Sequence, residues 1–526
     1  MLYRLLVFLV LIAFLTISCK EKAKENNSSN IENASVTSLS GESLAKAYCA
    51  SCHLFPEPKL LSKKTWKYGL LPQMAHRMGI YDDVTRQSLI ESNAGGELVK
   101  RNNIFPEQPL VNDKEWQLIQ DYYIESAPDS LKIESKKLKD KIRGLKVEVP
   151  DFHISPPMVT AIKFNADLNE VLVADTKADF STINILDKNL HSINTLALPS
   201  PISHIDYKSD TIIATLMGSF TPSDNPSGSL VKIFKRPGDK EYKGFKTILR
   251  NLQRPVQSTF VDINEDNFED IIVCEYGNHT GKLSLFVNSK NGQYEKRVLN
   301  SDPGSAAVEI KDINDDGLKD MVVLMSQGKE RIDVYYNQGE GDFKVETLLE
   351  FPAVYGSVSF SMVDWNKDGH EDIIYVNGDN ADYSRFPKPY HGLRIFLNDG
   401  DNNFQETFFQ QQNGAYKAII FDFDKDGDID IALTSYFPDL VNSPKEGFVF
   451  MENISVNDVI QFDLKSFNKA SSGRWLIMET TDLDQNNFPE LLLGSFTGME
   501  INGDIDRNTA KHFLQNSPTL LQLKFD

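Results

Sequence analysis

The chain has 526 residues, of which 55 are Lys or Arg and 75 are Asp or Glu, so its formal net charge is −20. This excess of negative charge disfavours a nucleic-acid partner, because phosphates attract basic surfaces. The length exceeds one ordinary domain of about 100–200 residues, and we therefore expect two folded units.

The N-terminus reads MLYRLLVFLVLIAFLTISCK, in which an apolar run over residues 5–17 ends just before Cys19. The run is short for a membrane span and is typical of a secretory signal. A cysteine at this place resembles the lipid-modified cysteine of bacterial lipoproteins, although Thr16 stands where leucine is usual. The resemblance implies a signal peptide over residues 1–19, lipidation of Cys19 and anchoring to the membrane of a bacterial cell envelope. An uncleaved anchor is the alternative.

Residues 20–40 are polar and rich in Asn and Ser, which predicts a flexible tether. The stretch YCASCHLF follows, with the pattern C-x-x-C-H formed by Cys49, Cys52 and His53. This pattern is the attachment site of a c-type haem, in which both thiols form thioethers and the imidazole binds the iron. A redox CxxC would lie in an α/β pattern, and a zinc site would need a second Cys or His pair; neither accompanies this motif.

Helical periodicity surrounds the motif, in a first helix that ends at CxxCH, a middle stretch LSKKTWKYGLLPQMAHRMG and a closing aromatic stretch NDKEWQLIQDYYIES. This order resembles monohaem class I cytochrome c over residues 41–128. The resemblance implies a small all-α domain with one covalent haem, His53 as the proximal ligand and a methionine as the distal ligand. We favour Met74, which follows a proline in LPQM; Met78 and His76 are the alternatives.

A Lys-rich stretch over residues 129–143 predicts a linker, and the sequence then changes to short β-rich runs. One unit recurs in them as DINEDNFED, DINDDGLKD, DWNKDGHED and DFDKDGDID, with side-chain oxygens at positions 1, 3, 5 and 9. Oxygens at alternate positions of a tight loop converge on one point and suit calcium, so about four calcium ions are expected. The predicted ligands are Asp262, Asn264, Asp266, Asp270, Asp312, Asn314, Asp316, Asp320, Asp364, Asn366, Asp368, Asp372, Asp422, Asp424, Asp426 and Asp430.

A weaker copy of the loop has Asp482, Asp484, Asn486 and Glu490, and two more degenerate copies lie upstream. None of the three glycine-containing loops has the Glu at position 12 that closes an EF-hand, and strands rather than helices flank them. Seven copies that begin 43–60 residues apart, at 163, 206, 262, 312, 364, 422 and 482, indicate an array of supersecondary units.

Each full unit contains four predicted strands, so seven units predict an all-β seven-bladed β-propeller over residues 144–526. The units resemble FG-GAP and VCBS repeats, including the integrin α-subunit propeller. The whole chain is similar to multidomain bacterial lipoproteins that join a small cytochrome to such repeats. The last unit is one strand short, and we predict that residues 145–149 complete it beside residues 519–525, since full closure removes an exposed edge.

Loops between the second and third strands are long and aromatic, and we expect them to form a ligand face. Its candidate residues are Glu275, Tyr276, His279, Tyr383, Arg385, Tyr390, His391, Tyr436 and Asp439. Cys274 lies in an apolar run and is expected to be a buried thiol, which leaves no cysteine pair for a disulfide.

Electron transfer in the envelope is the favoured function, with the propeller binding a redox partner protein, a glycan or another protein ligand. A propeller dehydrogenase that uses its own haem as first acceptor, for a sugar or alcohol, is one alternative; an adhesion or glycan-binding lipoprotein is another. An electron carrier or binding protein is favoured over an enzyme, because two axial ligands leave no iron position open to substrate.

Overall fold

The computed structural model describes residues 40–133, 136–177, 180–236, 238–239, 241–379, 386–456, 459–498 and 507–525. Gly41–Asp526 forms one compact unit, to which Met1–Ser40 does not belong. The signal peptide, its Cys19 and almost all of the tether therefore lie outside the described residues. Among the helices that the structure describes, none combines the length and the apolar character of a bilayer-spanning segment.

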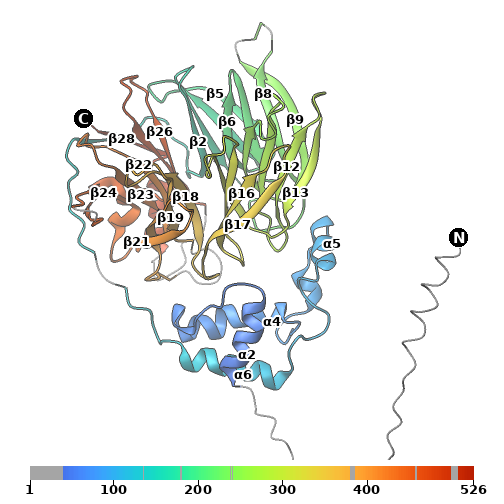
Figure 1. Cartoon of the computed structure of the whole chain (residues 1–526). Coiled ribbons are helices and arrows are strands. Elements are labelled where there is room, and N and C mark those ends of the chain that lie inside the picture. The colour runs from blue at the N-terminus through green and yellow to red at the C-terminus, as the bar shows by residue number, and fades with distance from the viewer. Residues whose placement is uncertain are drawn as a thin grey trace, which may run out of the picture. The chain divides into compact units, whose positions relative to one another are not determined.

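The N-terminal part of the compact unit is helical (Figure 1). Its elements are α2 (Gly41–Tyr48), η1 (Cys49–Ser51), η2 (Pro58–Leu60), α3 (Lys63–Thr65), the π-helical η3 (Trp66–Leu70), α4 (Leu71–Arg77), η4 (Arg86–Leu89), α5 (Ala94–Arg101) and α6 (Asp113–Ser126). The Ser62 side chain caps α3, and Asn112 and Glu115 form a capping box at the start of α6. Trp66 and Tyr123 are buried in the shared core, with ring centroids 4.3 Å apart.

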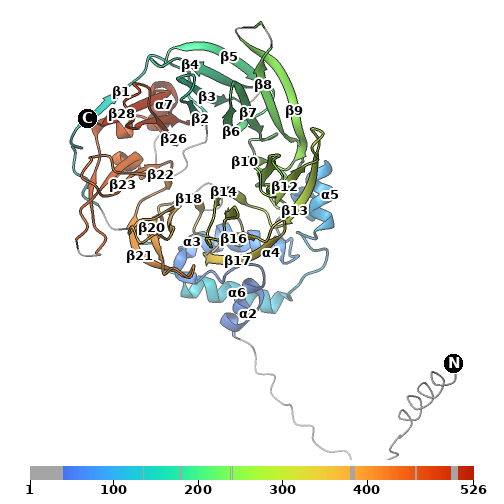
Figure 2. The same ribbon diagram turned by 45° about the horizontal axis from the view of Figure 1, so that its top comes forward.

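The rest of the unit consists of seven four-stranded antiparallel sheets, which Figure 2 shows around a central axis. The predicted seven-bladed β-propeller is thus confirmed. Its first three sheets are β2 (Val159–Asn165), β3 (Glu170–Thr176), β4 (Ser181–Leu186) and β5 (Ser192–Leu198); β6 (Ile202–Lys208), β7 (Thr211–Leu216), β8 (Gly228–Lys235) and β9 (Tyr242–Leu252); and β10 (Pro255–Val261), β11 (Asp270–Glu275), β12 (Lys282–Asn288) and β13 (Tyr294–Asn300).

The next three sheets repeat this order. They are β14 (Ser305–Lys311), β15 (Asp320–Met325), β16 (Arg331–Asn337) and β17 (Phe343–Glu350); β18 (Ser357–Val363), β19 (Asp372–Asn377), β20 (Gly392–Asn398) and β21 (Phe404–Gln411); and β22 (Ala415–Phe421), β23 (Asp430–Ser435), β24 (Phe448–Asn453) and β25 (Phe462–Lys465). The seventh has β26 (Trp475–Thr481), β27 (Glu490–Ser495), β28 (Leu520–Phe525) and β1 (Leu145–Glu148). Three short helices, η5 (Pro444–Gly447), η6 (Asn468–Ser471) and α7 (Arg507–Asn516), lie in the last two blades.

The second strands carry the core of the propeller. Every residue of β11, β15, β19, β23 and β27 is buried, because each of these strands has a neighbouring blade on either side. Cys274 on β11 is fully buried, as predicted, and burial raises the pKa of its thiol to about 12. Cys49, Cys52 and Cys274 are free thiols, so the described residues contain no disulfide.

The two ends of the propeller sequence meet in the seventh blade. β1 pairs antiparallel with β28, with Leu145 opposite Phe525 and Glu148 opposite Gln522. The side chains of Leu145 and Val147 pack against a buried cluster that joins the sixth and seventh blades. The predicted closure is therefore confirmed, and β1 is the outermost strand of its sheet.

The predicted linker is bound to the propeller over much of its length. The Lys139 backbone donates to the Leu464 carbonyl oxygen at 3.0 Å and accepts from Ser466 N–H at 2.8 Å. Ile142 is buried in the cluster between the sixth and seventh blades. Lys136 Nζ lies 3.4 Å from Glu446 Oε1, and burial lowers the pKa of Lys136 to about 8. Residues 136–142, called the connector below, are therefore part of the propeller.

Candidate functional site

The three residues of the CxxCH motif lie where α2 ends in the turn η1. Cys52 is exposed, whereas Cys49 is half-buried against the helical core, and burial raises the pKa of its thiol. His53 Nδ1 lies 3.0 Å from the Leu54 carbonyl oxygen, a distance at which Nδ1–H donates. This hydrogen bond leaves the lone pair of Nε2 available to a metal, which is the usual arrangement of a ligating histidine.

The candidate distal ligands come from α4 and its C-terminal end. Met74 and Met78 are both partly buried and pack against the same core cluster as Cys49. His76 is 2% exposed, and its Nε2 lies 3.0 Å from Asp83 Oδ1. That contact occupies the nitrogen that would bind iron, so the two methionines suit a haem better than His76. The donor set of two thiols, a free imidazole nitrogen and a thioether fits a c-type haem.

The repeated acidic loops join the first and second strands of their blades and share one hydrogen-bond pattern. In the fourth blade, Asp312 accepts the N–H groups of Asp316 at 3.2 Å and Gly317 at 2.9 Å. Asn314 Oδ1 also accepts from Asp316 N–H, at 3.3 Å. The loop backbone thus turns the side chains at positions 1, 3 and 5 toward one another. The loops at Asp262, Asp364 and Asp482 repeat these contacts.

The ninth residue of each loop has a different environment from the first five. Asp320 is fully buried, and its two oxygens accept the N–H groups of Ile313 at 2.9 Å and Asn337 at 2.7 Å. An asparagine at the end of four of the third strands completes this contact and was not predicted from the sequence. These asparagines are Asn288, Asn337, Asn398 and Asn453, whose side-chain amides also donate to the carbonyl oxygen at loop position 8. The signal was present as an asparagine at the end of four third strands.

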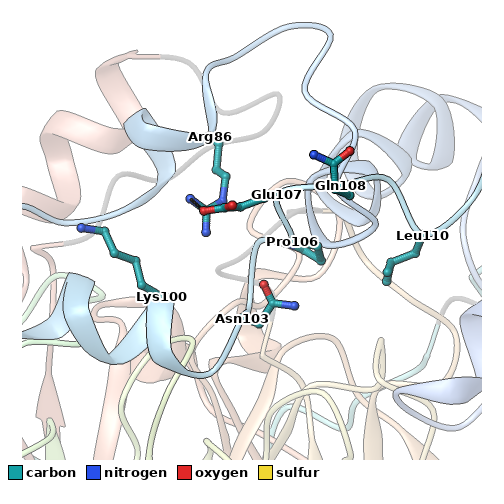
Figure 3. Close-up of a pocket in the computed structure, with 7 residues that line it drawn as sticks. All are labelled: Arg86, Lys100, Asn103, Pro106, Glu107, Gln108 and Leu110. Atoms are coloured by element: carbon teal, nitrogen blue, oxygen red, sulfur yellow. Dashed lines mark ion pairs between the residues drawn. The ribbon is translucent and has the colours of Figure 1, made fainter.

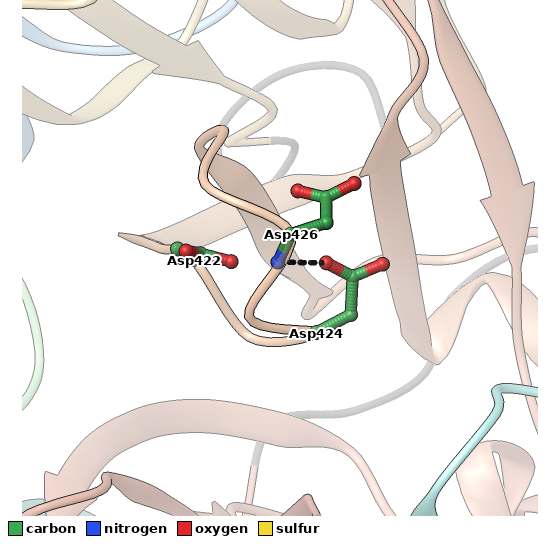
Figure 4. A group of neighbouring side chains, drawn as sticks. All are labelled: Asp422, Asp424 and Asp426. Carbon is green, nitrogen blue, oxygen red and sulfur yellow. Dashed lines mark hydrogen bonds between the residues drawn. The ribbon is translucent and has the colours of Figure 1, made fainter.

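The sixth-blade loop brings the most carboxylates together. Oxygens of Asp422, Asp424 and Asp426 lie within 4.8 Å of one another, in the arrangement of Figure 4. Burial and the nearby carboxylates raise the pKa of Asp428 to about 6. Burial, with Asp424 and Asp428 nearby, raises the pKa of Asp430 to about 7. This loop carries a concentration of negative charge that a divalent cation would neutralise.

Several residues expected on a ligand face lie in the interior instead. Glu275 is fully buried, where Gln253 N–H donates to it at 2.8 Å and Ser284 Oγ at 2.6 Å. His391 is also fully buried, and Tyr436 is 1% exposed. Their packing explains this: Glu275 is the last residue of β11, and the Tyr436 ring lies against Tyr416, Phe496 and the Arg474 guanidinium.

The other expected face residues are dispersed. Tyr390 is mostly buried and stacks on Tyr355, with centroids 5.0 Å apart, and Arg254 lies over the Tyr276 ring. Asp439 accepts the N–H groups of its own turn. Tyr383 and Arg385 lie outside the described residues. The described members of this set therefore do not converge on one site.

His279 instead contacts the helical region. Its ring meets Phe105 edge-on with centroids 5.1 Å apart, and its Nδ1 lies 2.9 Å from Asp224 Oδ2. Nearby, Glu91 accepts from Ser223 Oγ at 3.1 Å and from Asp224 N–H at 3.0 Å. Loops of the second and third blades therefore bind the helical region at the face where a ligand was expected.

A pocket of about 520 Å³ lies in the helical region (Figure 3). It is lined by Arg86, Lys100, Asn103, Pro106, Glu107, Gln108 and Leu110. Arg86 Nε donates to the Phe105 carbonyl oxygen at 2.7 Å, and Lys100 pairs with Glu97 at 2.8 Å. Because these cations already have partners, the pocket adds no strong anion site, and none of the predicted site residues lines it.

Comparison with known proteins agrees with the repeat structure. Residues 262–323 and 312–375 match the FG-GAP-like repeat. No curated protein matches the sequence. Among solved structures, the N-terminal domain of Nup159 is similar at 10% identity and a TM-score of 0.43, covering 76% of this chain and all of that one. The Dos1 propeller is similar at 9% identity and a TM-score of 0.42, covering 70% of this chain and 79% of that one.

A luciferin-regenerating enzyme is 11% identical with a TM-score of 0.38, over 72% of this chain and 95% of that one. Similarity at this level carries no argument about function, so the architecture rests on the sheet topology. Residues 262–375 match FG-GAP-like repeats and lie within a seven-bladed β-propeller.

Proposed function

We propose that this chain is a c-type cytochrome for electron transfer in a bacterial cell envelope, anchored through lipid on Cys19. The observation that carries the proposal is that Cys49 of the CxxCH motif and Met74 pack against one helical core, while the hydrogen bond of His53 Nδ1 leaves its Nε2 available to a metal. The propeller serves as the binding module for a redox partner protein, or for a glycan or protein ligand.

In this proposal Cys49 and Cys52 hold a single haem c covalently, and His53 and Met74 are the axial ligands. The haem supplies reversible one-electron transfer, and thioether ligation favours its ferrous form. The chain's own contribution is to orient His53 through the Leu54 carbonyl and to surround the group with apolar side chains. Tyr48, Phe55 and Leu70 flank the same core cluster and suit that role.

The axial-ligand assignment is tested by two matched substitutions, Met74→Ala and Met78→Ala. We expect the wild-type chain to show a low-spin reduced spectrum and, when oxidised, a methionine-to-iron charge-transfer band. Met74→Ala should remove that band and Met78→Ala should preserve it. Loss of the band in Met78→Ala alone would show that Met78, and not Met74, is the axial ligand. A chain without covalent haem would refute the proposal.

We further propose that the acidic loops bind about four calcium ions, which stabilise the propeller. Positions 1, 3 and 5 supply the converging oxygens in the loops at Asp262, Asp312, Asp364 and Asp422, with a weaker site at Asp482. The support is the shared hydrogen-bond pattern of these loops and the close approach of three carboxylates in the sixth blade. Hard oxygen ligands in flexible loops favour calcium over softer metals.

A further inference from the structure

One loop of the propeller packs against the helical core. Val354, between β17 and β18, is half-buried against the cluster that also carries Cys49, Met74 and Met78. It is the one propeller residue in this cluster among the residues that the structure describes. The apolar surroundings of the proposed haem therefore include a side chain from the other part of the chain.

The loop that carries Val354 is held rigidly by the fourth and fifth blades. Glu330 is 3% exposed and accepts the N–H groups of Gly356 at 3.1 Å and Ser357 at 2.8 Å. The backbone of Phe351 donates to the Glu330 carbonyl oxygen at 2.8 Å, and its ring stacks on Tyr375 with centroids 4.0 Å apart. Both ends of the loop are thus fixed, so the blades set the position of Val354.

Contacts elsewhere hold the helical region against the same face. Besides the hydrogen bonds that Ser223 and Asp224 donate to Glu91, and the Phe105–His279 ring contact, the start of α5 lies directly on the propeller backbone. A Cβ added at Gly95 would stand 2.4 Å from the Asp224 carbonyl carbon. Such a close approach needs glycine and indicates a fitted interface.

We propose that Val354 is a positioning residue of the haem crevice: it closes the crevice from the propeller side and keeps water out of it. The inference rests on the proposed cytochrome function. Solvent exposure and nearby charge are two of the means by which a protein sets the reduction potential of a haem. The propeller would therefore help to set that potential, in addition to binding a partner.

The test uses the full-length, haem-loaded chain and measures the midpoint potential by redox titration. Val354→Asp should lower the potential, because a nearby negative charge and added water both favour ferric iron. Val354→Ile should leave it unchanged, since the apolar cover is preserved. The matched control is Val345→Asp, which places the same charge on an exposed side chain. Val345 lies near the start of β17, whereas the loop that carries Val354 follows the end of this strand.

If Val354→Asp fails to fold, Val354→Ser gives the same comparison without a charge and should also lower the potential. Equal midpoint potentials in wild type, the Val354 variants and Val345→Asp would overturn the inference while leaving the cytochrome intact. A wild-type chain that carries no covalent haem would instead refute the proposed function itself. The two failures are therefore distinguishable in one preparation.

Discussion

Replacing Ile142 by alanine tests whether the connector is part of the folded propeller. Ile142 is 5% exposed and packs in a cluster with Phe448, Trp475 and Leu523. Truncating a buried isoleucine to alanine costs about 2–5 kcal/mol, because apolar contact is lost and a cavity remains. We expect a loss of about 3 kcal/mol in the free energy of unfolding.

For a propeller of about 380 residues, the entropy of unfolding is about 0.8 kcal/mol/K, so this loss corresponds to a fall of roughly 4 °C in Tm. Trp475 is fully buried in the same cluster, so tryptophan fluorescence during thermal and urea unfolding is a suitable assay. The matched control is Lys141→Ala, at the exposed neighbouring position. If Ile142→Ala melts like Lys141→Ala, the connector is a free linker and the packing argument is wrong.

Two more predictions concern the propeller. Removing calcium with a chelator should lower its Tm and leave the haem spectrum unchanged, because a cation at 100 times its Kd stabilises by about 2.7 kcal/mol per site. Asp424→Asn should reduce the fall in Tm on chelation, whereas the control Asp399→Asn, on a turn outside the acidic loops, should not. A Tm unaffected by chelation would contradict the calcium assignment. Burial raises the pKa of Glu330 to about 7 from 4.5. The folded state then holds a proton that the unfolded state releases, so stability falls by roughly 3 kcal/mol as pH rises from 4 to 8. Glu330→Gln should weaken the pH dependence of the free energy of unfolding, measured by urea titration. The variant should be less stable than wild type at every pH, because the amide has one acceptor oxygen fewer than the carboxyl group. The same dependence on pH in wild type and variant would refute this prediction.

Much of the propeller could be predicted from the sequence because its signals are local and repeated. The acidic loop marks the junction of the first and second strands in each unit, and the alternating apolar residues mark the strands. The closure at β1 and β28 followed from counting strands, since a blade with three strands leaves an edge that the unassigned run at residues 145–149 could cover.

Residues whose role depends on distant partners could not be predicted. Glu275 and His391 have the chemistry of ligand-binding residues and stand in or beside loops, yet both are fully buried. Glu91 accepts hydrogen bonds from Ser223 and Asp224, which lie more than 130 positions later in the chain. No period or spacing in the sequence encodes such pairs, because they form only when separate elements pack.

The sequence by itself therefore determined the repeat unit, the number of blades and the closure, and it is the source of the prediction that named residues bind haem and calcium. The tertiary structure alone decided that residues 136–142 bind the sixth and seventh blades, and that Val354 joins the helical core. The physical reason is that a strand or an acidic loop is specified by neighbours within a few residues, whereas burial is set by which surfaces meet after the chain has folded.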